Sequence, residues 1–242
     1  MIAAELHHKI GELKGSEDVL TSTVFGFLKY PLMRPILLDF LGRAIKYFDE
    51  QQRLSDTTIL EQLGEMLHFH FWKMIQINGT DDFTEPDLLI EGENCCLMVE
   101  VKYKSELSGE DQLRRYQRAL EQFGQGKPHR ALIYLTADPT PPILGPIALS
   151  TLEEKEFYWL SWLELHSAIC DTLADLGESA APLANDLLEI LKIRGLEPFV
   201  GFTKTASIIP SADFFWTESK FFSDYDESRR LKGFNTKIFW EG

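Results

Sequence analysis

Apolar residues recur with helical spacing over the first 66 residues, and short extended runs replace this pattern afterwards. Ser16 is a good N-cap followed by two acids, so we predict a helix from there to about Tyr30. Two prolines interrupt the pattern, and the second can open another helix over residues 36–48. A third helix is predicted over residues 56–67, which makes the N-terminal region helical.

Beyond this region lie short runs of β-branched and aromatic residues, separated by turn residues. The first three predicted strands lie within HFHFWKMIQI (68–77), PDLLIEG (86–92) and CCLMVEVKY (95–103). They are followed by a helix over about 109–123, a strand over 130–137, a short strand near 157–160, and helices ending near 176 and spanning 182–193. This order predicts a mixed α/β domain with a central sheet.

The composition is that of a globular protein, since 44% of the 242 residues are hydrophobic and 26% are charged. No apolar run reaches the roughly 18–20 residues that a membrane span requires. The N-terminus lacks a signal-peptide pattern, and the three cysteines cannot form a disulfide framework. We therefore expect a soluble cytoplasmic protein with no membrane partner.

Charge is distributed unevenly along the chain, whose formal net charge is −14. Residues 61–100 and 131–200 are strongly acidic, whereas residues 101–130 carry seven bases and four acids. An acidic protein is not expected to coat nucleic acid without regard to sequence. The basic segment is most simply a solvated helix face, and a surface that meets phosphate groups is the alternative.

The strand CCLMVEVKY contains the clearest candidate chemistry. Alternate residues of a strand share a face, so Glu100 and Lys102 are expected to be neighbours on an otherwise apolar strand. The alternative is an ion pair at an exposed strand end. Asp87 starts the preceding strand and can lie beside Glu100 if the two strands form a hairpin. Two converging carboxylates can bind a hard divalent cation and leave positions for water and phosphate.

Two helices are expected to turn polar side chains inward. At about 100° per residue, Glu17 falls in the apolar stripe of its helix, where a carboxylate is unexpected without a cation or a donor. A favourable interaction with the helix dipole is the alternative, although Asp18 serves that role more naturally. Gln112 lies in an apolar stripe together with Tyr116. The other faces of that helix carry Arg114, Arg115 and Arg118, which could reach phosphates or simply face solvent.

The succession of Glu17, Pro86-Asp87, Glu100-Val101-Lys102 and Gln112-x-x-x-Tyr116 resembles the PD-(D/E)XK, or restriction-endonuclease-like, nuclease superfamily. The helix motif is similar to that of nucleases related to the RecB nuclease domain. The resemblance covers about residues 16–136 and implies an αβββαβ core with a mixed central sheet flanked by helices. It also implies a nuclease that uses Mg²⁺, or Mn²⁺ as a substitute, to hydrolyse phosphodiester bonds in DNA.

The resemblance assigns a role to each matching position. Asp87, Glu100 and the backbone carbonyl of Val101 would bind the metal, with Glu17 as a direct or water-mediated ligand. Lys102 would be the catalytic lysine, and Gln112 would organise the site. Tyr116, like Gln112, would organise the site or contact phosphate. The possible phosphate contacts of Arg114, Arg115 and Arg118 follow from their charge and their place on the helix rather than from the resemblance.

Several alternatives stay open at this point. The same site could cleave RNA, or the chain could be a non-catalytic module of the nuclease fold that binds a protein partner. A homodimer would suit double-strand cleavage. His68 and His70 would share a strand face, but without a third ligand they are more simply structural. Residues 199–242 contain eleven aromatic residues and are predicted to form an extension, packed on the domain of residues 1–198 or in a dimer interface.

Overall fold

The computed structural model describes residues 16–79, 82–103, 112–146, 150, 152 and 156–198, all of which belong to one unit of the chain, Met1–Pro198. Their arrangement confirms the predicted α/β architecture with a mixed central sheet. The predicted extension over residues 199–242 lies outside the described residues.

The described strands form one seven-stranded sheet in the order β2-β1-β9-β8-β7-β6-β3. In chain order they are β1 (Ile45–Lys46), β2 (Asp49–Arg53), β3 (His68–Phe71), β6 (Leu88–Glu91), β7 (Cys95–Val101), β8 (His129–Thr136) and β9 (Phe157–Ser161). β8 pairs in parallel with both β7 and β9, and the other pairings in the sheet are antiparallel. A separate two-stranded ribbon joins β4 (Ile75–Gln76) to β5 (Phe83–Thr84).

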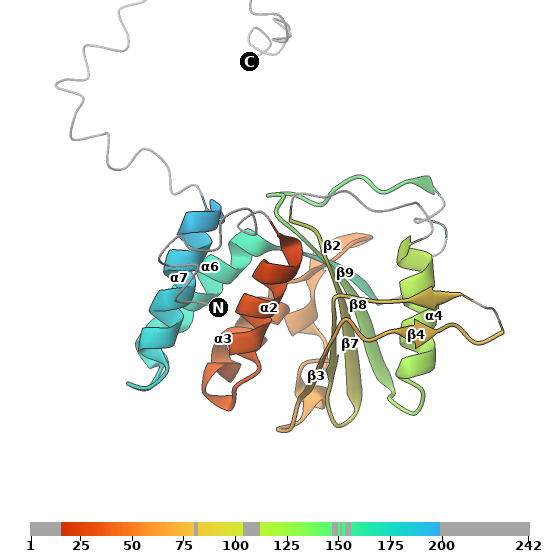
Figure 1. Cartoon of the computed structure of the whole chain (residues 1–242), viewed down its shortest axis with the longest axis horizontal. Coiled ribbons are helices and arrows are strands. Elements are labelled where there is room, and N and C mark those ends of the chain that lie inside the picture. Colours follow the sequence, from red (N-terminus) through yellow and green to blue (C-terminus); the bar gives the residue numbers. More distant parts are fainter. Residues whose placement is uncertain are drawn as a thin grey trace, which may run out of the picture. The chain divides into compact units, whose positions relative to one another are not determined.

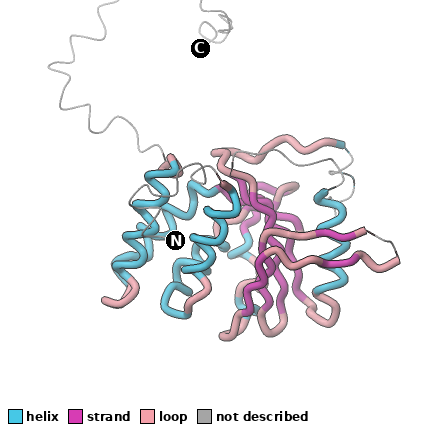
Figure 2. Tube along the Cα trace, in the orientation of Figure 1, coloured by secondary structure: helices cyan, strands magenta, loops and turns pink. Residues whose placement is uncertain are grey.

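Helices cover both faces of the sheet, so the domain has three layers (Figures 1 and 2). One side carries α2 (Glu17–Leu28), α3 (Arg34–Gly42), α6 (Trp162–Thr172) and α7 (Ala181–Arg194), and the other carries α4 (Gln112–Phe123). None of these described helices has the length and apolarity needed to cross a membrane.

β7 lies inside the sheet and supplies side chains to both layers of the core. Leu97 and Val99 pack with the four helices on one face, whereas Cys96 and Met98 pack with α4 on the other. Every residue of this strand is buried. Burial on both faces explains the nearly continuous apolar sequence of the strand, which only Glu100 interrupts.

α2 begins at the predicted cap, where the hydroxyl of Ser16 accepts a hydrogen bond from the Val19 N–H at 3.4 Å. Such a cap contributes about 1 kcal/mol of stability. The apolar stripe of the helix is buried in the core, and its members include Leu20, Val24 and Leu28. The cap and the stripe together fix the position of Glu17, the first residue of the helix.

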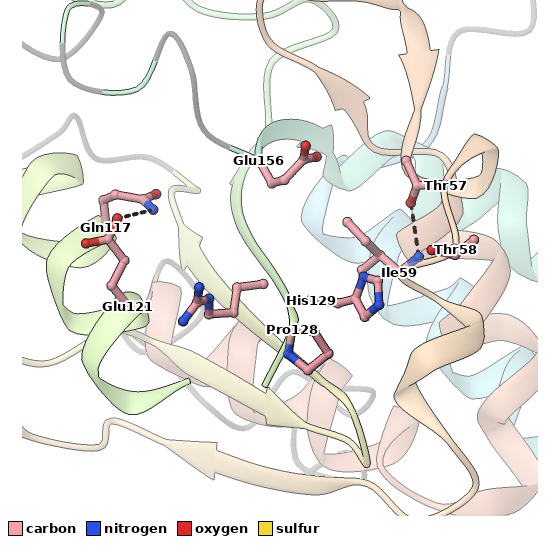
Figure 3. A pocket seen from close by; sticks show the side chains of 9 residues that line it. Thr57, Thr58, Ile59, Gln117, Glu121, Pro128, His129 and Glu156 are labelled. Carbon is pink, nitrogen blue, oxygen red and sulfur yellow. Dashed lines mark hydrogen bonds between the residues drawn. The ribbon is translucent and has the colours of Figure 1, made fainter. Parts of the chain in front are cut away.

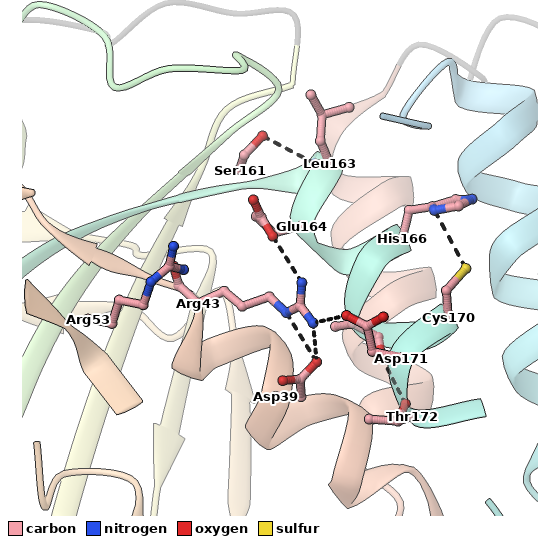
Figure 4. A network of polar contacts seen from close by, with 11 residues as sticks. Asp39, Arg43, Arg53, Ser161, Leu163, Glu164, His166, Cys170, Asp171 and Thr172 are labelled. Carbon is pink, nitrogen blue, oxygen red and sulfur yellow. Dashed lines mark hydrogen bonds and ion pairs between the residues drawn. The ribbon is translucent and has the colours of Figure 1, made fainter. Parts of the chain in front are cut away.

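Arg43 joins α3 to α6 through three carboxylates (Figure 4). Its guanidinium group lies 2.8 Å from Asp39 on α3. It also lies 3.2 Å from Glu164 and 2.5 Å from Asp171, both on α6. The three carboxylate side chains are 36–67% exposed, so each pair contributes at most about 1 kcal/mol.

The predicted helix over residues 56–67 is wrong, because this segment contains only short 3₁₀ turns. Its polar side chains bond to nearby backbone groups and so compete with helical hydrogen bonds. The carboxylate of Asp56 accepts from the Arg53 N–H at 2.7 Å, and the hydroxyl of Thr57 donates to the Leu54 carbonyl at 2.7 Å.

The predicted helix over residues 36–48 extends too far. α3 ends at Gly42, and Ile45 and Lys46 form β1, which pairs with both β2 and β9. The sequence did not predict β2 because its residues, DEQQR, show no apolar alternation. Four of these five residues are exposed, as expected for an edge strand.

Candidate active site

The predicted acidic residues, Lys102 and Gln112 meet where β7 ends, near the first turns of α2 and α4. β6 and β7 form the expected hairpin, in which Leu88 faces Val99. One step further along this register, Asp87 lies beside Glu100, and each carboxylate acts on the pKa of the other. The carboxylate of Asp87 also accepts a hydrogen bond from the Val101 N–H at 2.8 Å. The antiparallel register therefore places two carboxylates together.

Glu100 is a buried carboxylate with 1% of its surface exposed. Its Oε1 atom accepts a hydrogen bond from Gln112 Nε2 at 2.7 Å and lies 2.6 Å from Lys102 Nζ. Its Oε2 atom is buried as well and has no hydrogen-bond partner among the described residues. A buried carboxylate oxygen without a donor is costly, and its lone pairs are free to bind a cation.

The two carboxylates resist being ionised together. Burial, and then the charge of Asp87, raises the pKa of Glu100 from 4.5 to about 8. Burial also raises the pKa of Asp87, although the Val101 N–H and the charge of Lys102 partly oppose this change. A divalent cation bound to both groups would favour their ionised forms.

Lys102 directly follows β7 and contacts two carboxylates. Its ammonium group lies 2.6 Å from Glu100 and 3.4 Å from Glu17. Burial alone would lower the pKa of this lysine, but Glu100, Glu17 and Asp87 outweigh burial and raise it. Lys102 therefore remains a cation within the site.

Glu17 faces inward, as its place in the helical stripe predicts. One carboxylate oxygen lies 3.4 Å from Lys102 Nζ, and the other accepts a hydrogen bond from the Tyr103 N–H at 2.8 Å. Its side chain is 21% exposed. Lys102 is thus one cation that meets this carboxylate, and the role of Glu17 as a metal ligand stays a prediction.

Gln112 and Tyr116 support Glu100 from α4. The Nε2 atom of Gln112 contacts both Glu100 and the hydroxyl of Tyr116, the latter at 3.0 Å. That hydroxyl donates to the Glu85 carbonyl at 3.4 Å. Tyr116 is 5% exposed, and of its two predicted roles this burial favours organising the site over contact with phosphate.

The three arginines of α4 lie at different depths. Arg114 and Arg115 are half-buried, and Arg118 is exposed. At about 100° per residue, Arg114 and Arg118 lie on the opposite side of the helix from Gln112. Their contact with a nucleic-acid backbone stays a prediction.

The donor set fits a hard divalent cation that keeps part of its water shell. Asp87 and Glu100 supply adjacent carboxylates, and Glu100 Oε2 lacks a donor within the described part of the chain. The described residues contain no group of three or more His, Cys, Asp or Glu side chains that could hold a metal ion. Water, a substrate phosphate oxygen and the predicted Val101 carbonyl would therefore have to complete the coordination.

Tyr103 and Arg194 belong to the surroundings of the site, and sequence reasoning missed both. The hydroxyl of Tyr103 donates to the Arg194 carbonyl at 2.8 Å, and Arg194 Nη1 donates to the Ser16 carbonyl at 3.5 Å. The end of α7 thus contacts the cap of α2, 178 residues away. The available signal was a charged residue in the apolar stripe of α7, where Arg194 follows Leu187 and Leu191 and is 6% exposed.

A separate cavity of about 450 Å³ lies at the other end of the parallel strands (Figure 3). His129 starts β8 and Glu156 precedes β9, whereas Glu100 and Lys102 lie at the carboxyl end of β7. The residues that line this cavity are Thr57, Thr58, Ile59, Gln117, Glu121, Pro128, His129, Arg130 and Glu156. None of the predicted site residues is among them.

Comparisons of the chain with models of known protein families, with curated proteins and with solved structures returned no match. The functional interpretation therefore depends on the residues of the site and on their geometry.

Proposed function

We propose that the protein is a metal-dependent nuclease that hydrolyses phosphodiester bonds in DNA. The observation that carries this proposal is the pair of Asp87 and Glu100 beside Lys102, in which Glu100 Oε2 is buried and has no donor among the described residues. Burial raises the pKa of both carboxylates, an arrangement that costs stability and is typical of functional sites.

The order of the elements supports the same proposal. α2, β3, β6, β7, α4 and β8 occur along the chain in the αβββαβ order implied by the resemblance to PD-(D/E)XK nucleases. Other elements interrupt this order, with α3, β1 and β2 between α2 and β3 and the β4–β5 ribbon between β3 and β6. In this proposal α2 contributes Glu17 and α4 contributes Gln112. The β6–β7 hairpin contributes Glu100, with Asp87 directly before β6 and Lys102 directly after β7.

The roles of the side chains follow from their contacts. A bound divalent cation would supply positive charge and a water molecule of lowered pKa. Asp87 and Glu100 would hold the cation, and Gln112 would fix Glu100 through its 2.7 Å hydrogen bond. Lys102 would donate to the attacking water or to a non-bridging phosphate oxygen, where negative charge grows as water bonds to phosphorus and the ester P–O bond breaks.

This proposal is tested by cleavage assays in Mg²⁺ or Mn²⁺. The substrates are linear, circular and single-stranded DNA, and single-stranded RNA. Asp87→Asn keeps the shape of the side chain and removes its charge. Glu91→Gln is the matched control, because Glu91 lies at the other end of β6 and pairs with His70 and Lys127. We expect cleavage by the parent and the control, and none by Asp87→Asn or in chelator.

The remaining outcomes of this experiment also have a clear meaning. Equal cleavage by the parent and Asp87→Asn would contradict the proposed site. Cleavage of RNA without DNA would change the substrate and keep the mechanism. No cleavage by any preparation would favour a non-catalytic module that binds a protein partner.

A further inference from the structure

Trp72 lies at the same end of the strands as the proposed site. β3 and β7 run in the same direction, because both pair antiparallel with β6. Trp72 follows β3 and Lys102 follows β7, so the two residues lie at the same end of these strands. The N–H of Trp72 donates to the carbonyl of Asp87 at 3.3 Å, which ties its backbone to a proposed metal ligand.

The backbone of Trp72 is strained. Its φ angle is 47°, and within the described part of the chain no other non-glycine residue has a positive φ. Bulky side chains rarely adopt this conformation, and glycine or asparagine would adopt it at a lower cost. The hydrogen bond to Asp87 and the pairing of Phe71 with Leu88 hold the backbone in place. Strain of this kind is concentrated at functional sites.

The indole of Trp72 is fixed on one side and open on another. It packs against the ring of Phe71, with centroids 5.6 Å apart and planes inclined by 42°. Trp72 is nevertheless 36% exposed. An aromatic ring that is supported by a second ring and partly open to solvent can receive another flat ring.

Two more large apolar side chains are exposed in the chain that follows Trp72. Met74 is 64% exposed, and Phe83, on the strand that pairs with β4, is 55% exposed. Lys73 lies between Trp72 and Met74, with its ammonium group 4.4 Å from the centre of the Phe123 ring. Aromatic side chains together with a cation are the combination that binds single-stranded nucleic acid.

We propose that the indole of Trp72 stacks on one unpaired base of the substrate, next to the phosphodiester bond that is cut. This inference rests on the proposed nuclease function and narrows its substrate to single strands or duplex ends that open. A base inside a duplex has both faces covered by its neighbours, so away from duplex ends only an unpaired base can stack on Trp72. Stacking on one aromatic side chain changes affinity by roughly 5- to 150-fold.

Three variants separate the ring from the backbone. Trp72→Phe keeps an aromatic face, whereas Trp72→Leu removes it and keeps apolar bulk on the same strained backbone. Phe48→Leu is the matched control, because Phe48 is an aromatic residue of similar exposure, 38%. It lies in the turn between β1 and β2, and β2 is the edge strand on the opposite side of the sheet from β3. Each variant is assayed for cleavage of a labelled single strand and a blunt duplex, and for Mg²⁺ binding by calorimetry.

Binding is measured separately in chelator, with a labelled decanucleotide and a matched strand that carries one abasic position. We expect Trp72→Leu to weaken single-strand binding and cleavage at least fivefold, while Trp72→Phe and Phe48→Leu stay within twofold of the parent. Mg²⁺ affinity should not change, and the parent should bind the abasic strand less tightly than the complete one.

The inference is overturned if Trp72→Leu binds and cuts single strands as the parent does. It is also overturned if this variant loses Mg²⁺ binding and duplex cleavage in the same proportion, because Trp72 would then only support Asp87. Failure of the nuclease function is distinct. In that case no substrate is cut, and the binding measurements still decide whether Trp72 stacks on bases.

Discussion

Two clusters in this protein join one cation to several carboxylates, and their surroundings differ. Arg43 meets three carboxylates whose side chains are 36–67% exposed. Lys102 meets Glu17 and Glu100, and the Glu100 side chain is 2% exposed. Water can solvate the carboxylates of the first cluster, whereas Glu100 Oε2 in the second has neither water exposure nor a partner among the described residues.

The difference separates a structural cluster from a candidate catalytic one. Arg43 connects α3 and α6 at the surface, and its carboxylates retain access to water at little cost. The buried cluster keeps Glu100 and Asp87 close together and raises the pKa of both. Such an arrangement costs stability unless a further cation joins Lys102 there, so its presence in the folded protein favours a functional role.

The two clusters should differ most in the effect of replacing their central cations, Lys102 and Arg43. Lys102→Ala removes the donor closest to Glu100 and should lower kcat about 10²- to 10³-fold. Arg43→Ala should leave kcat within twofold and lower the free energy of unfolding by about 1 kcal/mol. Single-turnover cleavage and urea denaturation of both variants measure these effects. Parental cleavage rates in Lys102→Ala would remove this lysine from the mechanism.

The next largest expected difference between the two clusters is that the buried one makes the stability of the protein depend on pH. The pKa of Glu100 in the folded protein is about 8, above its ordinary value of 4.5. The folded state therefore holds this proton more tightly, and the resulting stability is complete below about pH 4.5 and is lost as the pH rises through 8. We expect the protein in chelator to lose roughly 2–4 kcal/mol of unfolding free energy across this window.

Glu100→Gln should remove most of that loss. The amide does not titrate, so the variant in chelator should be more stable than the parent at pH 8, although it should bind Mg²⁺ poorly. Urea denaturation at pH 5, 6.5 and 8 measures the difference. The same pH dependence in parent and variant would show that Glu100 is not the titrating group.

Glu17→Gln should lower kcat less than Lys102→Ala does. The amide oxygen can still accept the hydrogen bond from Tyr103 N–H, but the charge that pairs with Lys102 is lost. We expect kcat to fall about tenfold through poorer placement of Lys102. The predicted role of Glu17 as a direct or water-mediated ligand implies weaker Mg²⁺ binding as well, and unchanged Mg²⁺ affinity by calorimetry would remove Glu17 from the coordination of the cation.

The sequence predicted much of the site because the relevant contacts follow from local periodicity. Strand alternation places Glu100 and Lys102 on one face, where they lie 2.6 Å apart. The hairpin brings Asp87 to Glu100, and the apolar stripe of α4 turns Gln112 toward Glu100 at 2.7 Å. Each of these predictions required only the period of one element or a turn between neighbouring strands.

Features that depend on distant contacts or on backbone conformation were not predictable in this way. The contact between Arg194 and Ser16 joins residues 178 positions apart. The positive φ of Trp72 occurs at a residue type that seldom adopts it. The error over residues 56–67 has a local cause, since hydrogen bonds made by Asp56 and Thr57 outweigh the helical spacing of apolar residues.

Calorimetric titration of Mg²⁺ into the parent, Asp87→Asn and Glu91→Gln decides whether Asp87 and Glu100 form a metal site. We expect saturable binding to the parent and to Glu91→Gln, with release of protons near pH 7 as the carboxylates with raised pKa values ionise. Asp87→Asn should bind at least tenfold more weakly. Equal Mg²⁺ binding by all three proteins, or none by the parent, would contradict a metal site at Asp87 and Glu100.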